Sequence, residues 1–206
     1  MNGESHNYFV LRRLHSLLGI FPIGVFLLEH FFSNSFAFQG PEQFNSLVEA
    51  FQGLWATPFL EVGLIGLPIL FHAVFGLVIA YTGSNNFLSY SYYRNWTYFF
   101  QRVTGIFALV FVFMHVYSAR IAPMLAGKHV TFNDIHLLFQ PTWAKWFYII
   151  GIISAIFHFT NGIGTALMTW GITVSQRSQK VVAILCWGLF VLMSIWGLLI
   201  LRTFVV

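Results

Sequence analysis

The chain has 206 residues, of which 58% are hydrophobic and only 8% are charged, and its mean hydropathy is +0.76. Soluble domains carry about 25% charged residues, so this composition excludes an ordinary soluble domain and a disordered chain. A single cysteine, Cys186, excludes a disulfide-stapled scaffold. The formal net charge of +4 rests on so few charged residues that it bears on orientation in a membrane and not on nucleic acid binding.

Five apolar stretches are each long enough to cross a membrane, since a spanning helix needs about 20 mostly apolar residues. We expect five transmembrane helices, over residues 13–33, 59–82, 97–120, 143–172 and 180–203. The predicted fold is an all-α integral membrane protein in which residues 1–206 form a single transmembrane domain. Pro22 and Gly24 fall inside the first helix, where neighbouring helices would satisfy the carbonyl that proline leaves without a donor.

The longest predicted loop covers residues 34–58. Pro41 is placed to open a helix in it, because proline is favoured at the first helical position. Apolar residues then recur at helical spacing: Phe44, Leu47, Val48, Phe51 and Leu54. The pattern predicts an interfacial helix that lies on the membrane or caps the bundle, with a partly ordered loop as the alternative.

Five helices place the two termini on opposite sides of the membrane. The side that holds the N-terminus carries six basic residues and one acid, namely Arg12, Arg13, Arg94, Arg102, Arg177, Lys180 and Glu4. The other side carries four of each kind, namely Arg120, Lys128, Lys145, Arg202, Glu42, Glu49, Glu61 and Asp134. Because basic residues favour the cytoplasmic side, the N-terminus is predicted to be cytoplasmic.

Four of the eight histidines lie in apolar surroundings: His30, His72, His115 and His158. Each falls on a different one of the first four predicted helices, at spacings of 42, 43 and 43 residues. Ionisable side chains in a bilayer are costly and usually face the bundle interior with a partner. A lone buried histidine is most often a hydrogen-bonded core residue, but four at regular spacing indicate a cofactor.

The depths of these histidines divide them into two pairs. The helix rise places His30 and His115 roughly 6 to 8 Å from the outer ends of their helices, and His72 and His158 roughly 20 Å from theirs. Two pairs at matched depths are what two stacked bis-histidine haems require, held by helices one to four. The absence of a CxxCH sequence excludes covalent c-type attachment.

Two other uses of buried histidines are a metal site and a proton relay. A single zinc or copper centre needs its ligands at one depth, whereas the two pairs are separated by about 13 Å along the helix rise. A proton-carrying transporter would normally carry acids deep in its spans, and only Glu29 and Glu61 come near that position.

Two glycines support the assignment of the deeper histidine pair to a haem. Gly76 and Gly162 follow His72 and His158 by four residues and share their helix faces, which would give a flat macrocycle room. Glycine is also common at membrane helix contacts. His15 has no matching partner at its depth, so we expect it near the edge of the inner haem or on a partner surface.

Four polar residues at the same level as His15 are candidates to hold haem propionates: Arg12, Arg13, Ser16 and Arg102. Guanidinium groups pair well with carboxylates. Simple anchoring at the cytoplasmic membrane surface is the alternative for Arg12 and Arg13.

Five segments together are distinctive: RRLHSLLGIFPIGVFLLEH, FHAVFGL, SYYRNWTYFFQRVTGI, FMHVYSARIA and FHFTNG followed by TWGITVSQRS. With them, the chain resembles, over nearly its whole length, the five-helix, di-haem cytochrome b anchors of succinate:menaquinone oxidoreductases. The resemblance implies that His30 and His115 ligate a distal haem b, and that His72 and His158 ligate a proximal haem b.

The resemblance also implies partners and a place in the cell. A flavoprotein subunit and an iron–sulfur subunit would bind the chain in a bacterial or archaeal cytoplasmic membrane, and electrons from succinate would cross both haems to menaquinone. The chain itself would hold no dicarboxylate site. Related di-haem fumarate reductase anchors carry a glutamate two residues before the fourth haem histidine, and its replacement by Ile156 argues against a proton pathway there.

Two rival functions remain open on the sequence. A haem b subunit of a hydrogenase or formate dehydrogenase also uses bis-histidine haems, although with a different distribution of histidines over its helices. A haem-free structural anchor would use the histidines only for hydrogen bonds between helices.

Glu29 is the candidate acid for quinone reduction, which consumes two protons as well as two electrons. It precedes His30 and lies roughly 6 to 8 Å from the outer surface on the helix rise. We expect partial burial to favour its protonated form, with a headgroup-level position or a hydrogen bond to a nearby histidine as the alternative.

Overall fold

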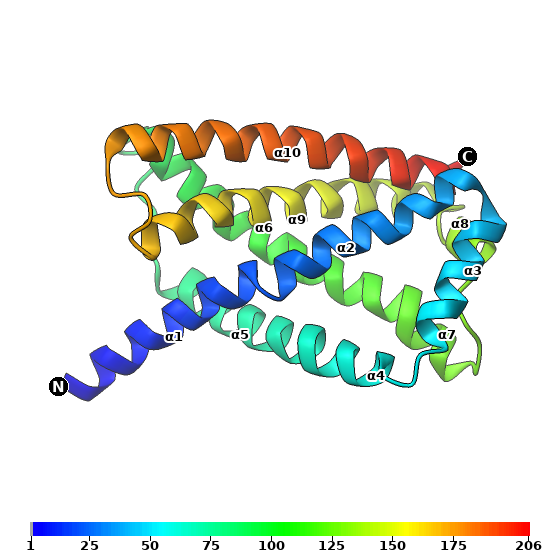
Figure 1. The fold of residues 1–206 in the computed structure, drawn as a ribbon. Coiled ribbons are helices and arrows are strands. Elements are labelled where there is room, and N and C mark those ends of the chain that lie inside the picture. The colour runs from blue at the N-terminus through cyan, green and yellow to red at the C-terminus, as the bar shows by residue number, and fades with distance from the viewer. Residues whose placement is uncertain (1) are drawn as a thin grey trace.

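The computed structural model describes residues 2–206, with side chains from His6 onward, so Glu4 lies outside the described side chains. Five helical spans run between the same two ends of the molecule, and the first and third cross the bundle obliquely in opposite directions (Figure 1). They cover His6–Gln39, Thr57–Thr82, Tyr93–Leu125, Thr142–Thr169 and Gln176–Val205. The described residues form helices and turns without a strand, which confirms the predicted all-α membrane fold.

Several spans consist of more than one element. The first comprises α1 (Asn2–Ile20), α2 (Ile23–Asn34) and a 3-10 turn (Ser35–Gln39), and α3 (Pro41–Gln52) follows it. The second comprises α4 (Thr57–Leu60), a π-helical turn (Glu61–Gly66) and α5 (Leu67–Thr82), and the third comprises α6 (Tyr93–Val116), a π-helical turn (Tyr117–Ile121) and α7 (Ala122–Leu125). After α8 (Phe132–Leu138), the last two spans are α9 (Thr142–Thr169) and α10 (Gln176–Val205).

The first span differs from the single helix that the sequence predicted. It is interrupted at Phe21 and Pro22, which separate α1 from α2. Proline has no N–H to donate and its ring crowds the preceding turn, so the helix stops and starts again. The consequence is that His15 and His30 lie on two separate helices and not on one continuous face.

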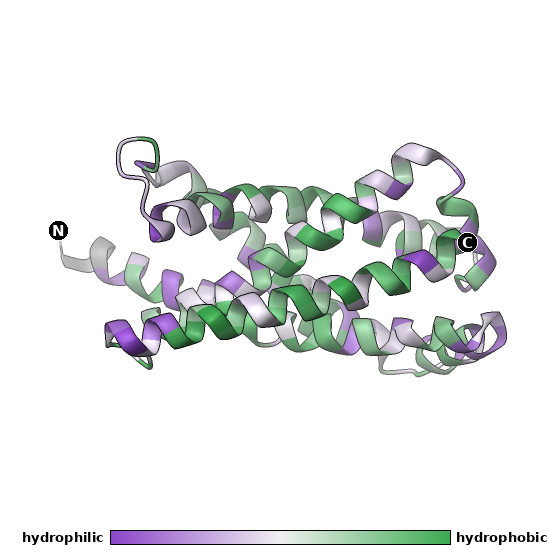
Figure 2. Cartoon of the chain, turned by 90° about the horizontal axis from the view of Figure 1, so that it is seen from above, coloured by the Kyte–Doolittle hydropathy of each residue, from purple (hydrophilic) through white to green (hydrophobic). Residues whose placement is uncertain are grey.

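The bundle is organised around α9, which packs against α1, α6 and α10. Its Ile156 is completely buried, among core residues that include Phe111 and Met193. Large apolar side chains elsewhere point outward, as Phe113 and Leu192 do, at 70% and 68% exposure. Hydrophilic residues gather toward both ends of the bundle, and hydrophobic ones occupy the length between them (Figure 2). This distribution fits a membrane-embedded protein.

The two ends of the bundle have different structures. The N-terminal end, where α1, α6 and α10 begin, has only short connections, whereas α3 and α8 cover the C-terminal end (Figure 1). The helix predicted in the loop 34–58 is confirmed, with Pro41 in its first turn and Leu54 just beyond its end.

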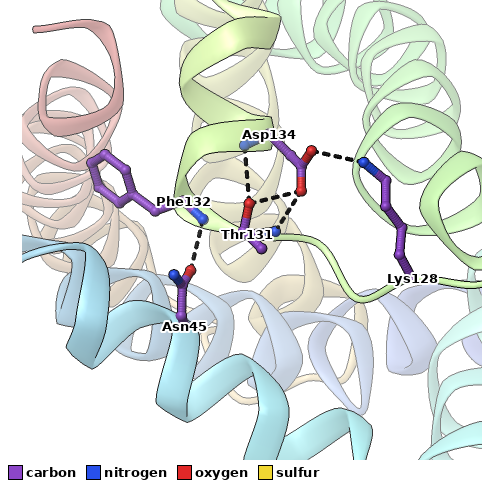
Figure 3. Close-up of polar contacts among 5 residues, drawn as sticks. All are labelled: Asn45, Lys128, Thr131, Phe132 and Asp134. Carbon is purple, nitrogen blue, oxygen red and sulfur yellow. Dashed lines mark hydrogen bonds and ion pairs between the residues drawn. The ribbon is translucent and has the colours of Figure 1, made fainter.

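Buried aromatic contacts and polar contacts hold this cover in place. Phe44 of α3 is buried against Phe132 and Phe204. The side-chain oxygen of Asn45 accepts a 2.8 Å hydrogen bond from the backbone N–H of Phe132, at the start of α8 (Figure 3).

Candidate functional site: two histidine pairs

The first pair lies between α5 and α9. The imidazole rings of His72 and His158 have centroids 6.0 Å apart and are nearly perpendicular, at 87°. The Nδ1 atom of His72 lies 2.9 Å from the carbonyl oxygen of His15, and Nδ1 of His158 lies 2.9 Å from that of Gln101. A carbonyl oxygen only accepts, so both Nδ1 atoms donate and both Nε2 atoms keep a free lone pair. This is the tautomer that a metal-binding histidine needs.

Glycines let both imidazoles approach these carbonyls. Gly19 follows His15 by four residues, and a Cβ atom there would lie 2.6 Å from Cε1 of His72. Gly105 follows Gln101 by four residues, and its Cβ would lie 2.8 Å from Cε1 of His158. The same arrangement, a carbonyl and a glycine four residues later, therefore seats each histidine of the pair from a neighbouring helix.

Gly76 and Gly162 contact residues of neighbouring helices. Gly76 faces the side chain of His15, whose Cε1 lies 3.1 Å from where a Cβ would stand, and Gly162 faces the amide of Gln101. The spacing of these glycines from the histidines of their own helices did not predict these neighbours. A shared spacing in the sequence could have identified Gly19 and Gly105. The residues whose carbonyls accept, His15 and Gln101, each precede their histidine by 57 residues, and a glycine follows each of them by four.

His15 has a neighbouring histidine at its own level, contrary to the depth estimate from the sequence. Its ring stacks on that of His72, with centroids 3.9 Å apart and planes within 11° of each other. The packing of α1 against α5 brings the two histidines to one level, which the depth estimate for a single straight helix did not capture. Nδ1 of His15 is buried without a hydrogen-bond partner among the described residues.

The second pair lies between α2 and α6. The rings of His30 and His115 have centroids 5.5 Å apart at an angle of 80°. Nδ1 of His115 lies 3.3 Å from the hydroxyl of Tyr148, and the ring of Phe111 stacks on His115 at 5.7 Å. The amide nitrogen of Asn34 lies 3.4 Å from both ring nitrogens of His30. Among the described residues, the ring nitrogens of this pair contact side chains and no backbone carbonyl.

The centroid distances of 5.5 and 6.0 Å are compatible with one metal ion between the two imidazoles of each pair. A metal–nitrogen bond of about 2 Å on each side sets the ring centroids roughly 6 Å apart. Because Gly19 and Gly105 have no side chain, the rings of His72 and His158 lie directly against the backbone of the neighbouring helices. Among the described residues, no three His, Cys, Asp or Glu side chains gather as ligands for one ion.

The proposed propionate-binding residues lie near the N-terminal end in different surroundings. Arg102 donates to Asn85 at 3.0 Å and to the Tyr98 hydroxyl, and its Nε is buried without a partner in the described part of the chain. Arg12 lies over the ring of Tyr8, while Arg13 lies over the rings of Phe9 and Trp170. Ser16 is half-buried.

Glu29 is exposed, so the expected partial burial within the chain is wrong. Consecutive helical residues point about 100° apart, and the turn that directs His30 inward directs Glu29 out of the bundle. The hydroxyl of Ser33, one turn later, donates to the Glu29 carboxylate.

An ion pair that was not predicted joins the two π-helical turns. Arg120 donates to Glu61 at 2.8 Å, and the two residues lie in the π-helical turns of the third and second spans. Such turns occur frequently at functional sites, and one of these begins two residues after His115.

Comparison with known proteins agrees with this architecture. Residues 84–198 match the family model described as the succinate dehydrogenase/fumarate reductase transmembrane subunit. Over 205 residues, and over the full length of both chains, the sequence is 44% identical to the succinate dehydrogenase cytochrome b558 subunit of Bacillus subtilis (strain 168). The chain therefore belongs to the family of succinate dehydrogenase and fumarate reductase transmembrane subunits, and is the membrane part of a multisubunit enzyme.

Proposed function

We propose that this chain carries electrons from an iron–sulfur subunit to menaquinone with the help of two bis-histidine haems b. The observation that supports it is the occurrence of two close imidazole pairs inside one membrane bundle. The name of the Bacillus relative, a cytochrome b558 subunit, adds support for haem b. When bound, the haems supply one-electron redox chemistry between the iron–sulfur subunit and the quinone.

In this proposal the four histidines would hold the two haem irons. His72 and His158 would hold the proximal haem through Nε2, because their Nδ1 atoms are engaged by carbonyls. His30 and His115 would hold the distal haem. Arg102 is the best placed of the propionate candidates, since its unpartnered Nε is free to donate to a carboxylate.

The flavoprotein and iron–sulfur subunits bind at the N-terminal end of the bundle in this proposal, on the cytoplasmic side of a bacterial membrane. The six basic residues predicted for that side support the orientation. Quinone is reduced near the C-terminal end, where Glu29 delivers protons taken up from outside. Ser33, as a donor to the Glu29 carboxylate, keeps that carboxylate oriented.

Haem content in the purified complex tests the proposal. We expect a sharp reduced α-band typical of low-spin bis-histidine haem b, and two haems for each copy of this chain. One haem per chain, or a high-spin signal, would contradict the two-haem arrangement. A complex without any haem spectrum would identify the chain as a structural anchor.

A further inference from the structure

A cavity of about 230 Å³ opens between α6, α9 and α10 at the N-terminal end of the bundle. These three helices lie side by side there (Figure 1). The residues that line the cavity change from polar to apolar along its length. Arg94 and Lys180 lie near the helix starts, while Phe157, Trp187 and Phe190 line the part toward the middle of the bundle. The cavity is therefore amphipathic in the direction of the membrane normal.

The polar part of the cavity is positively charged. No Asp or Glu lines it, and neither Arg94 nor Lys180 forms an ion pair with any residue that the structure describes. The first turn of α10, a helix of 30 residues, contributes Gln176 and Gln179 to the same wall. The positive end of the helix dipole thus adds to the two cations.

The wall contains a buried hydroxyl group, that of Thr173. Thr173 is only 6% exposed, and its Oγ1 accepts or donates no hydrogen bond within the described residues. Its carbonyl oxygen accepts from Nε2 of Gln179 at 3.0 Å, and the side-chain oxygen of Gln179 accepts from Arg94. This chain of hydrogen bonds holds Arg94 toward α10 and leaves the Thr173 hydroxyl to a ligand. A buried polar group without a partner is destabilising, and a bound anion would supply the missing hydrogen-bond acceptor.

We propose that this cavity binds the phosphate headgroup of an anionic phospholipid, with an acyl chain along Phe157, Trp187 and Phe190. Phosphate is the anion that two unpaired cations, a helix N-terminus and a hydroxyl donor recognise together. A free phosphate ion would leave the apolar half of the cavity without an occupant. A quinone headgroup would find no carboxyl or imidazole proton donor among the lining residues.

The inference does not depend on haem or on electron transfer, because no histidine lines the cavity. It does require that the cavity remain accessible when the partner subunits are present. The test therefore uses the assembled complex, purified in an uncharged detergent and depleted of lipid.

The experiment measures binding of phosphatidylglycerol by native mass spectrometry, with phosphatidylcholine, inorganic phosphate and menaquinone as competitors. We expect phosphatidylglycerol to bind at least about tenfold more tightly than phosphatidylcholine. Both lipids carry the same phosphodiester, but the quaternary ammonium of choline would be repelled by Arg94 and Lys180. Millimolar inorganic phosphate should not displace the lipid. Displacement by phosphate would identify a free-anion site, and displacement by menaquinone would identify a quinone site. Either result would overturn the proposal.

Matched variants locate the site. The Arg94→Gln/Lys180→Gln double variant should lose phosphatidylglycerol affinity by at least about tenfold, and Thr173→Val by a few-fold. Arg177→Gln is the control, because Arg177 is exposed in the same turn of α10 and does not line the cavity. Thermal midpoints of all variants report on folding, and the two single variants replace the double variant if it fails to assemble. Equal losses in Arg177→Gln and the cavity variants would show general surface attraction, and unchanged binding in the cavity variants would show a different site.

Discussion

The two histidine pairs are held in place by different parts of the protein. Backbone carbonyls fix both rings of the His72–His158 pair, and glycines on the opposite helices make room for them. The His30–His115 pair is surrounded by side chains of Tyr148, Phe111 and Asn34. A carbonyl cannot be removed by substitution, so the first pair depends on helix packing, whereas the second can be adjusted one side chain at a time.

The largest expected effect comes from the histidines themselves. Alanine at His72 or His158 should remove one haem of the two and weaken docking of the soluble subunits, since we place that pair nearer to them. Alanine at His30 or His115 should remove the other haem and spare docking. Haem content and subunit retention after purification measure both effects. Equal haem loss and equal subunit retention in all four variants would contradict two separate histidine pairs at different depths.

The glycines test whether backbone contact defines the first pair. Gly19→Ala and Gly105→Ala would each bring a methyl group within 3 Å of a histidine ring carbon. Overpacking of this kind costs about 1 to 3 kcal/mol, so occupancy of the proximal haem should fall by roughly tenfold while the distal haem remains. Gly63→Ala and Gly188→Ala are controls, because nothing lies within 4 Å of a Cβ at either position. Equal haem loss in controls and variants would contradict the assignment.

Glu29 tests the chemistry next to the second pair. Glu29→Gln removes the acidic proton but keeps the size of the side chain, so quinone reduction should slow by at least about tenfold with both haem spectra intact. Glu49→Gln, an exposed acid of α3, serves as the control in the same quinone reductase assay. Normal rates in Glu29→Gln would exclude this residue from proton delivery.

A smaller effect is expected from a single hydroxyl at the second pair. Tyr148→Phe removes the group that lies 3.3 Å from Nδ1 of His115 and leaves the ring in place. The loss of one hydrogen bond is worth about 1 kcal/mol, so the distal haem should be retained with an altered reduction potential. Potentiometric titration of both haems measures this. A shift confined to the proximal haem would contradict the proposed distal position of this pair.

The smallest effect concerns the cover over the C-terminal end. A hydrogen bond from Lys128, followed by those from Thr131, holds the pKa of the Asp134 carboxyl below its usual range. Stability from this group is therefore present above its usual pKa of about 3.9 and is lost as the pH falls through the lowered value. Because Lys128 is largely exposed, solvent screening limits the contribution to less than about 1 kcal/mol.

Hydrogen exchange checks this pH dependence with a control inside the same chain. The protection factors of the amides in residues 131–135, at the start of α8, should fall below about pH 4, after correction for the pH dependence of intrinsic exchange. The first turn of α10 has a capping box made of Ser175 and Ser178, which contains no carboxylate and should respond less. Parallel acceleration at both helix starts would indicate general opening of the protein.

The amino-acid sequence by itself determined which segments cross the membrane and which residues lie at similar depth. Length and hydropathy gave the five spans, because the thickness of the bilayer imposes a minimum length on any apolar helix. The constant rise of a helix placed His30 level with His115, and His72 level with His158, and these rings are neighbours in the fold. Pro41 and the apolar spacing after it were enough to predict α3.

Only the tertiary structure decided which groups surround the histidines. Gly19 and Gly105 were missed because a glycine's use depends on the helix packed against it, and sequence spacing reports only its own helix. His15 was expected to stand alone, yet the packing of α1 on α5 stacks it on His72. Glu29 was expected to be partly buried and is exposed, because the rotation of α2 about its axis is set by its neighbours. The depth of a residue in the membrane follows from its place along one helix, whereas the residues that it contacts depend on how two helices pack.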